Sequence, residues 1–144
     1  MIKVKETGCV IWSTAVNLYI FADKYDVPRL RLDVINAMHN VIHPILYGLP
    51  NWSIIPTIYD NLPEYSPLRH LVMDIFATRW DGQWIDEKRA RELLPRDFMF
   101  DVLTQSIRRT ISGPMLTTSD VCEYHGHVSE EEKRLCQDAR AAAK

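Results

Sequence analysis

The sequence predicts an all-α fold, an irregular bundle of about five to seven helices. Apolar residues recur at three- and four-residue spacing in several segments, which is typical of amphipathic helices. No segment shows a convincing strand alternation. Proline also follows a capping or boundary residue at three places, where the first turn of a helix accepts it: Pro28, Pro67 and Pro95. These observations together favour helices separated by short turns.

The composition is that of one folded domain. The chain has 144 residues, of which 47% are hydrophobic and 25% are charged, and this length is sufficient to bury a core. We expect a lead-in over residues 1–11, a helical domain over residues 12–115, and a Cys/His segment with a C-terminal helix over residues 116–144, packed on the same domain. The net charge of −2 gives little support to nucleic-acid binding through phosphate neutralisation.

The expected setting of the chain is intracellular, in the cytoplasm or the nucleus. Three cysteines without a secretory signal at the N-terminus do not form a disulfide framework. No apolar run approaches the roughly 20 residues that a membrane span requires. Five glycines are scattered singly rather than gathered in a phosphate-binding loop. We therefore expect no membrane, no direct nucleic-acid partner and no small-molecule substrate.

The first predicted helix begins near Ile11 and ends before Pro28, with Ser13 as a candidate cap. It is apolar on two sides. One side carries Val16, Tyr19 and Ala22, and the other carries Leu18, Phe21, Ala22 and Tyr25. A helix that is apolar on both sides has to be covered on both sides, which a single neighbouring helix cannot do.

The middle of the chain is expected to form three helices. The first runs from about Pro28 to His43, with Asp26 as its cap and Pro44 as its stop. Its predicted core face consists of Val34, Ile35, Met38, Val41, Ile42 and Ile45. A short helix follows over residues 57–62, or a slightly longer one that includes Pro56. A further helix spans residues 67–80, with a predicted core face of Leu68, Leu71, Val72, Ile75, Phe76 and Trp80.

The last part of the chain is expected to form two further helices after a mixed segment over residues 84–94. Pro95 begins the first of them, with Phe98, Val102, Leu103, Ile107 and Ile111 inward and Asp97, Asp101, Thr104 and Arg108 outward. Residues 112–114, with the sequence Ser-Gly-Pro, end it. Ser129 with Glu132 three residues later is a capping box for the final helix, which runs to Lys144.

Four residues near the C-terminus have the side chains of a tetrahedral zinc site with two cysteines and two histidines: Cys122, His125, His127 and Cys136. Their spacing, C-x2-H-x-H-x8-C, differs from that of zinc fingers. A turn would bring the first three ligands around an ion, and the final helix would bring Cys136. We therefore expect one structural Zn2+ whose binding is coupled to folding of the segment. The alternative is a chance cluster, with Cys136 as a small core residue and both histidines exposed.

Other reactive residues give weaker signals. Cys9 has no flanking nucleophile signature, and His39 and His43 lie one helical turn apart without the glutamate of a metalloprotease motif. The alternative function is a zinc-dependent enzyme that uses His125 and His127, although four protein ligands leave no open position for a substrate. The four tryptophans are either core or interface residues: Trp12, Trp52, Trp80 and Trp84.

Residues 18–31, with the sequence L-Y-I-F-A-D-K-Y-D-V-P-R-L-R, resemble the last helices of the BTB/POZ domain in fungal BTB proteins. Residues 59–69 and 94–103 resemble two further segments of that family, Y-x-x-T-P-x-x-S-P-L-R and L-P-x-E-F-x-x-D-V-L, and the tail over residues 122–127 also recurs there. The resemblance covers roughly residues 13–137. It implies the C-terminal end of a BTB domain followed by a BACK-like helical region, with the front of the BTB domain missing.

The resemblance further implies a non-catalytic protein–protein interaction module that either self-associates or serves as an adaptor. In the BTB fold, the second apolar side of the first helix packs on a sheet that lies in the missing part. We expect another molecule to cover this side here, most simply a second copy, so that the protein is a homo-oligomer. The expected partner-binding residues are Trp12, Val16, Tyr19, Phe21 and Tyr25.

Overall fold

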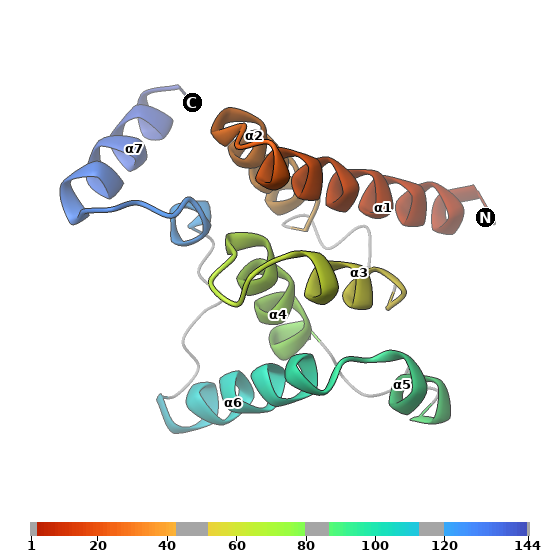
Figure 1. Cartoon of the computed structure of the whole chain (residues 1–144). Helices are drawn as coiled ribbons and strands as arrows, with labels where there is room; N and C mark the ends of the chain where they lie inside the picture. Colours follow the sequence, from red (N-terminus) through yellow and green to blue (C-terminus); the bar gives the residue numbers. More distant parts are fainter. Residues whose placement is uncertain (1–2, 43–51, 80–86, 113–119, 144) are drawn as a thin grey trace.

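The computed structural model describes residues 3–42, 52–79, 87–112 and 120–143 (Figure 1). Within these ranges the chain forms seven α-helices, one short 3-10 helix and no strand, which confirms the all-α prediction. The elements are α1 (Lys3–Lys24), α2 (Pro28–Ile42), α3 (Ile54–Asn61), α4 (Pro67–Arg79), α5 (Glu87–Leu93), α6 (Arg96–Ser112), η1 (Val121–Tyr124) and α7 (Glu130–Ala142). None of these helices is long and apolar enough to cross a membrane.

The helices are arranged in three levels in Figure 1. The pair α1 and α2 lies on one side, α3 and α4 lie in the middle, and α6 lies on the opposite side. Helix α7 stands away from the bundle and is joined to it through η1. The three levels share one apolar core, whereas α7 has no buried side chain.

Helix α1 is longer than the sequence predicts, because it begins at Lys3 and so includes most of the expected lead-in over residues 1–11. The segment before Ile11 contains no proline, and its one helix-weakening residue is Gly8. A glycine inside a helix costs only about 1 kcal/mol relative to alanine. A single residue of this kind does not stop a helix of 22 residues.

The end of α1 is a Schellman cap in which Asp26 adopts a left-handed backbone conformation, with φ of 51°. The Val27 N–H donates to the Ala22 carbonyl at 2.8 Å, and the Asp26 N–H donates to the Asp23 carbonyl at 3.3 Å. The Asp26 carboxylate accepts two hydrogen bonds from Arg31 at 3.2 Å. Asp26 thus ends the first helix and pairs with a side chain of the second, in place of the expected N-cap.

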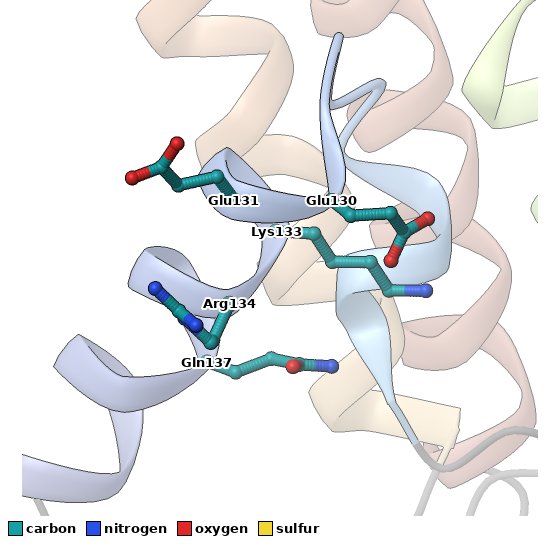
Figure 2. Close-up of a pocket in the computed structure, with 5 residues that line it drawn as sticks. All are labelled: Glu130, Glu131, Lys133, Arg134 and Gln137. Carbon is teal, nitrogen blue, oxygen red and sulfur yellow. The ribbon is translucent and has the colours of Figure 1, made fainter.

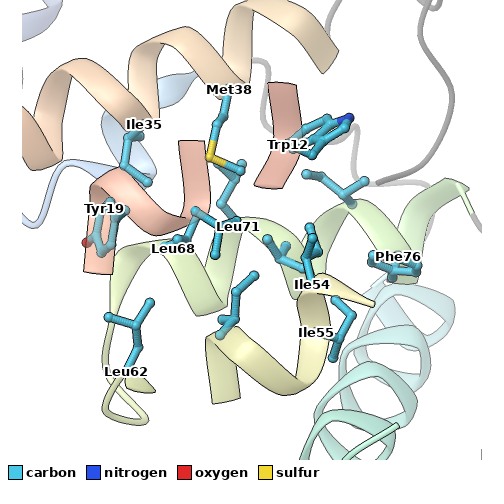
Figure 3. Packing of buried hydrophobic residues seen from close by; sticks show 14 of the residues in the cluster. Trp12, Tyr19, Ile35, Met38, Ile54, Ile55, Leu62, Leu68, Leu71 and Phe76 are labelled. Carbon is cyan, nitrogen blue, oxygen red and sulfur yellow. The ribbon is translucent and has the colours of Figure 1, made fainter. Parts of the chain in front are cut away.

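The core lies where α1 to α4 meet and continues to α6 (Figure 3). The predicted core faces are confirmed for the residues that the structure describes, each of which is at most 6% exposed: Val34, Ile35, Met38, Leu68, Leu71, Val72, Ile75 and Phe76. The side chains of Val41 and Ile42, and all of His43, Pro44 and Ile45, lie outside the described part of the structure. Trp80 and Trp84 also lie outside it.

Three of the five expected partner-binding residues lie in this core. Trp12, Val16 and Tyr19 are 3%, 1% and 1% exposed, because the side of α1 that carries them packs on α2 and α3. Their burial corrects the expectation that they contact a partner. Phe21 and Tyr25 lie on the other side of α1 and are 51% and 59% exposed, so they are accessible and their role in partner binding stays a prediction.

Helix α6 presents a different side to the core than the sequence predicts. Phe98 and Val102 are buried as expected, at 0% and 6% exposed. Leu103, Ile107 and Ile111 are 58%, 51% and 80% exposed, so the prediction that they point inward is wrong. Their apolar row lies on the side of α6 that faces away from the bundle.

Polar contacts explain this orientation of α6. Its inner side carries Asp101, which accepts a hydrogen bond from the Tyr59 hydroxyl at 2.9 Å. It also carries Gln105 and Arg109, whose side chains donate to the buried Asp74 carboxylate at 2.9 and 3.3 Å. Hydrogen bonds to charged groups contribute about 1.5–3 kcal/mol each, and an unpaired buried carboxylate is costly. These contacts fix the inner side of α6 even though its outer side is more apolar.

Helix α7 has no buried side chain, and the residues along one of its faces are partly covered: Lys133, Cys136 and Arg140. Leu135 and Val128, the large apolar residues in and just before it, are 60% and 95% exposed. The Ser129 hydroxyl accepts from the Glu132 N–H at 3.2 Å, which confirms the predicted capping box. The Glu132 carboxylate accepts in return from the Val128 N–H at 2.9 Å. The helix is thus well capped, but apolar burial does not attach it to the domain.

Candidate metal centre

The four predicted zinc ligands come from three adjacent pieces of the C-terminal segment. Cys122 lies in η1, His125 directly follows η1, His127 lies in the turn after it, and Cys136 lies in the second turn of α7. Gly126 separates the two histidines with a φ of 68°, a left-handed conformation that favours glycine. This turn directs both imidazoles to the same side as the cysteines.

The distances within the cluster fit a tetrahedral ion. One ligand atom from each of the four residues lies within 4.8 Å of the other three. The Cys122 and Cys136 sulfur atoms are 3.7 Å apart, and the Cys136 sulfur is 3.4 Å from the His125 Nδ1. Zinc bonds of about 2.3 Å to sulfur and 2.0–2.1 Å to nitrogen would separate two sulfurs by about 3.8 Å and a sulfur and a nitrogen by about 3.6 Å. Two edges of the tetrahedron are therefore already in place.

Helix α2 fixes the orientation of one imidazole. The His125 Nε2 lies 2.8 Å from the Asn36 Oδ1, so that the other nitrogen, Nδ1, faces the cysteines. A metal-bound histidine commonly donates its second N–H to an oxygen acceptor, which fixes the tautomer and the ring orientation. Asn36 is therefore placed as a supporting residue of the site.

The second imidazole has an unsatisfied nitrogen. The His127 Nε2 is buried and makes no hydrogen bond with the described residues. The ring lies 5.4 Å from that of His125, centroid to centroid. Because a buried polar atom without a partner is destabilising, this nitrogen is a further observation in favour of a bound ion.

Burial disfavours the charged forms of two of the four side chains, Cys122 and His125. It raises the pKa of the Cys122 thiol to about 11, an effect that the nearby Arg140 opposes. Burial also lowers the pKa of His125, with smaller contributions from His127 and Arg140. Neutral imidazole is the form that binds metals, and a divalent cation stabilises the thiolate that burial disfavours.

Asp120 and Arg140 connect the cluster to both of its neighbouring elements. The Asp120 carboxylate accepts from the Cys122 N–H at 3.0 Å and thereby caps η1, and it also accepts from Gln137 of α7. The Arg140 guanidinium lies 3.7 Å from both the Cys122 sulfur and the Asp120 carboxylate. Sequence spacing could have indicated Asp120, two residues before a cysteine, as a cap. Asn36 is 89 residues from His125 in the sequence and carried no such signal.

The remaining candidates from the sequence do not form a second site among the described side chains. His39 is 5% exposed and lies in the core, with its ring 6.2 Å from that of Tyr124, while its proposed partner His43 is outside the described residues. The side chain of Cys9 is also outside them. Trp52 is half-buried and packs edge-on against Phe76 at 5.9 Å.

An open hollow also lies along α7, but it is separate from the cluster (Figure 2). It is lined by Glu130, Glu131, Lys133, Arg134 and Gln137, all from one helix and four of them charged. None of the four cysteine and histidine residues lines it. Charged residues along one exposed helix indicate a solvated surface rather than a substrate site.

The chain matches no protein-family model, no curated protein and no solved structure. The resemblance to BTB/POZ proteins therefore depends on the motifs over residues 18–31, 59–69 and 94–103. Those motifs correspond to the end of α1 with the start of α2, to the end of α3 with the start of α4, and to the first half of α6. Any function assigned to the chain has to be argued from its own residues.

Proposed function

We propose that the chain is a non-catalytic, BTB C-terminal and BACK-like interaction module with one structural Zn2+ bound by Cys122, His125, His127 and Cys136. The proposed metal site is supported most directly by two distances. The Cys122 and Cys136 sulfur atoms are 3.7 Å apart, and the His125 Nδ1 is 3.4 Å from the Cys136 sulfur. Four protein ligands complete a tetrahedral shell and leave no position for a substrate or an activated water. A structural role follows from such a closed site.

The role of the ion would be to attach α7 to the helical domain. Val121, Cys122 and Tyr124 of η1 are buried, so η1 belongs to the core. Helix α7 has no buried residue, and Cys136 is its contribution to the cluster. Binding of the ion would supply the free energy that apolar burial does not supply there. The free thiols of Cys122 and Cys136 suit a reducing, intracellular setting.

The interaction role is supported by the exposed side of α1. Ile11, Leu18, Phe21 and Tyr25 recur at helical spacing, and each is 44–59% exposed. The rings of Phe21 and Tyr25 are in contact, with centroids 4.6 Å apart, so they form a continuous aromatic surface. We infer that this α1 face binds another protein molecule, either a second copy or a different partner.

The metal proposal is tested by native mass spectrometry of the full chain, which reports bound metal and copy number together. We expect one Zn2+ per chain, lost on treatment with a chelator and replaced by Co2+ with the absorption spectrum of a tetrahedral thiolate complex. Cys122→Ser should abolish stoichiometric binding, whereas Cys9→Ser, a matched change outside the cluster, should not. Equal zinc binding by both variants would contradict the assignment of the ligands.

The interaction proposal is tested with the paired substitution Phe21→Ser and Tyr25→Ser. Both side chains are more than half exposed, so the fold should tolerate the change. We expect loss of a binding partner or of self-association in sedimentation velocity, with zinc content unchanged. Retention of every association by this variant would exclude the α1 face as an interaction surface.

A further inference from the structure

A second row of exposed apolar residues runs along the outer side of α6. Phe100, Leu103, Ile107 and Ile111 are 68%, 58%, 51% and 80% exposed, and Met99 beside them is 42% exposed. Spacings of three and four residues place the row on one face of the helix. Figure 1 shows α6 at the opposite side of the bundle from α1 and α2. The row is therefore distinct from the α1 face.

The charged residues in the middle of α6 do not interrupt this row, because they are bound on the inner side. Asp101 accepts from the Tyr59 hydroxyl at 2.9 Å, and Arg109 donates to Asp74 at 3.3 Å. Gln105, one turn before Arg109, also donates to Asp74 at 2.9 Å. A molecule that covers the row would thus bury few charges along most of its length.

Two opposite charges lie along one edge of the row, one before its first residue and one between Ile107 and Ile111. Asp97 lies in the first turn of α6 and Arg108 near its last turn, and both are exposed. Eleven residues separate them, which is close to three turns at 3.6 residues per turn, so they lie on the same edge of the row. A second α6 packed in the parallel direction would place like charges at the same end and on opposite edges of the contact, so that no opposite charges would meet. A second α6 packed in the antiparallel direction would bring opposite charges together.

We propose that two copies of the chain associate through an antiparallel contact between their α6 helices. The two-fold axis passes near residues 102–103, midway between Asp97 and Arg108. In this register Asp97 of one copy faces Arg108 of the second, twice by symmetry. Phe100 of one copy packs between Leu103 and Ile107 of the second. The same surface thus supplies both the apolar cover and the complementary charges, which makes a second copy the occupant that fits this row.

The size of the row determines the strength of the contact. Five side chains at these exposures present roughly 500 Å2 on each copy, below the roughly 800 Å2 per partner of a standard interface. We therefore expect a reversible dimer in the micromolar range rather than a permanent one. The contact uses neither the zinc ligands nor the α1 face, so it can fail without affecting the proposed function.

Sedimentation velocity of the zinc-loaded full chain over a wide concentration range tests the proposal. Leu103→Glu should raise the dimer dissociation constant at least tenfold, because it places two carboxylates near the two-fold axis. Asp97→Arg and Arg108→Asp should each weaken the dimer, and the double charge swap should restore it. Circular dichroism and thermal unfolding of each variant verify that α6 remains folded.

Tyr65→Ser, at a position 87% exposed and outside both the α6 row and the α1 face, is the control. It should leave the α6 dimer intact. A monomeric wild-type chain at all concentrations, or a dimer that Leu103→Glu does not weaken, would overturn the proposal. A dimer that Leu103→Glu weakens but the double charge swap does not restore would overturn the antiparallel register. Dissociation by Phe21→Ser alone would assign self-association to α1 instead.

Discussion

Two regions of the molecule are held in place in different ways. One is the bundle of α1 to α4 and α6, and the other is the C-terminal helix α7. In the bundle, apolar side chains from five helices are buried in one continuous core. In α7 no side chain is buried, and its described contacts to the rest of the chain are polar or come from the cysteine and histidine cluster. The boundary between the two regions lies near Gly126. The η1 helix before it has three buried residues, whereas α7 after it has none.

This difference shows how a chain can extend a domain without enlarging its core. Apolar burial requires many residues on complementary faces, and α7 offers an exposed Leu135 and a mostly charged surface instead. A metal site needs only four side chains at suitable distances, and its stabilisation depends on one ion. The two regions should therefore respond differently to metal, to core substitutions and to pH.

The largest separation between the regions is expected on removal of the metal. Chelation, or Cys136→Ser, should release α7 while the bundle stays folded, because structural zinc in isolated fingers contributes about 10–16 kcal/mol of binding free energy at neutral pH. Hydrogen exchange should show loss of protection over residues 130–142 and little change over residues 67–79. Equal loss of protection in both ranges would mean that the ion stabilises the whole domain.

A core substitution should have the opposite effect, because it should destabilise the bundle itself. Phe98 is fully buried against Phe76 and Tyr59, with ring centroids 5.4 and 5.5 Å apart. Phe98→Ala should lower the free energy of unfolding by about 3–5 kcal/mol in urea titrations. Phe100→Ala, two residues away and 68% exposed, is the matched control and, at concentrations low enough to keep the chain monomeric, should change it by about 0.5 kcal/mol or less. Similar losses for both would mean that α6 is docked in another orientation.

A smaller effect is expected where the bundle supports the metal site. Asn36→Ala removes the acceptor 2.8 Å from the His125 Nε2 and should weaken zinc binding about 10- to 100-fold. Asn40→Ala, one turn further along α2 and exposed, should leave the affinity unchanged. Competition with a chromophoric chelator measures both. An unchanged affinity for Asn36→Ala would show that the cluster orients its own histidine.

The smallest effect concerns the bundle at alkaline pH. Burial, and then the Asp101 carboxylate that accepts from its hydroxyl, raise the pKa of Tyr59 above its ordinary value near 10. The unfolded chain therefore loses this proton first, and stability should fall as the pH rises above about 10. Tyr59→Phe should show less of this fall in denaturation midpoints between about pH 9 and pH 11. Tyr65→Phe, at a position 87% exposed, should behave as the wild type.

Much of the fold could be predicted because its signals are local. The prolines mark the starts of α2 and α4, and the spacing of Leu68, Leu71 and Val72 defines a core face. The four metal ligands span only fifteen positions, so a turn and one helix bring them together. Residue type and short spacing were sufficient for these features.

The parts that could not be predicted depend on distant residues. Helix α6 has an apolar row on one side and a mixed row on the other, and Asp74, 31 residues before Gln105, decides which side is inward. Trp12 and Tyr19 belong to the same apolar helix as Phe21, and the position of α2 decides which of them are buried. No spacing within a single helix contains that information.

Asp74 also has a consequence for the order in which the chain folds. Its carboxylate accepts hydrogen bonds from Gln105, Arg109 and Tyr124, which lie 31, 35 and 50 residues further along the chain. Closing the loops between such distant residues costs entropy, so we expect these contacts to form after the local ones. A state with α1 to α4 assembled but α6 and η1 undocked would carry this carboxylate without its donors. We therefore expect the two distant segments to dock cooperatively, because either one alone leaves the Asp74 carboxylate only partly satisfied.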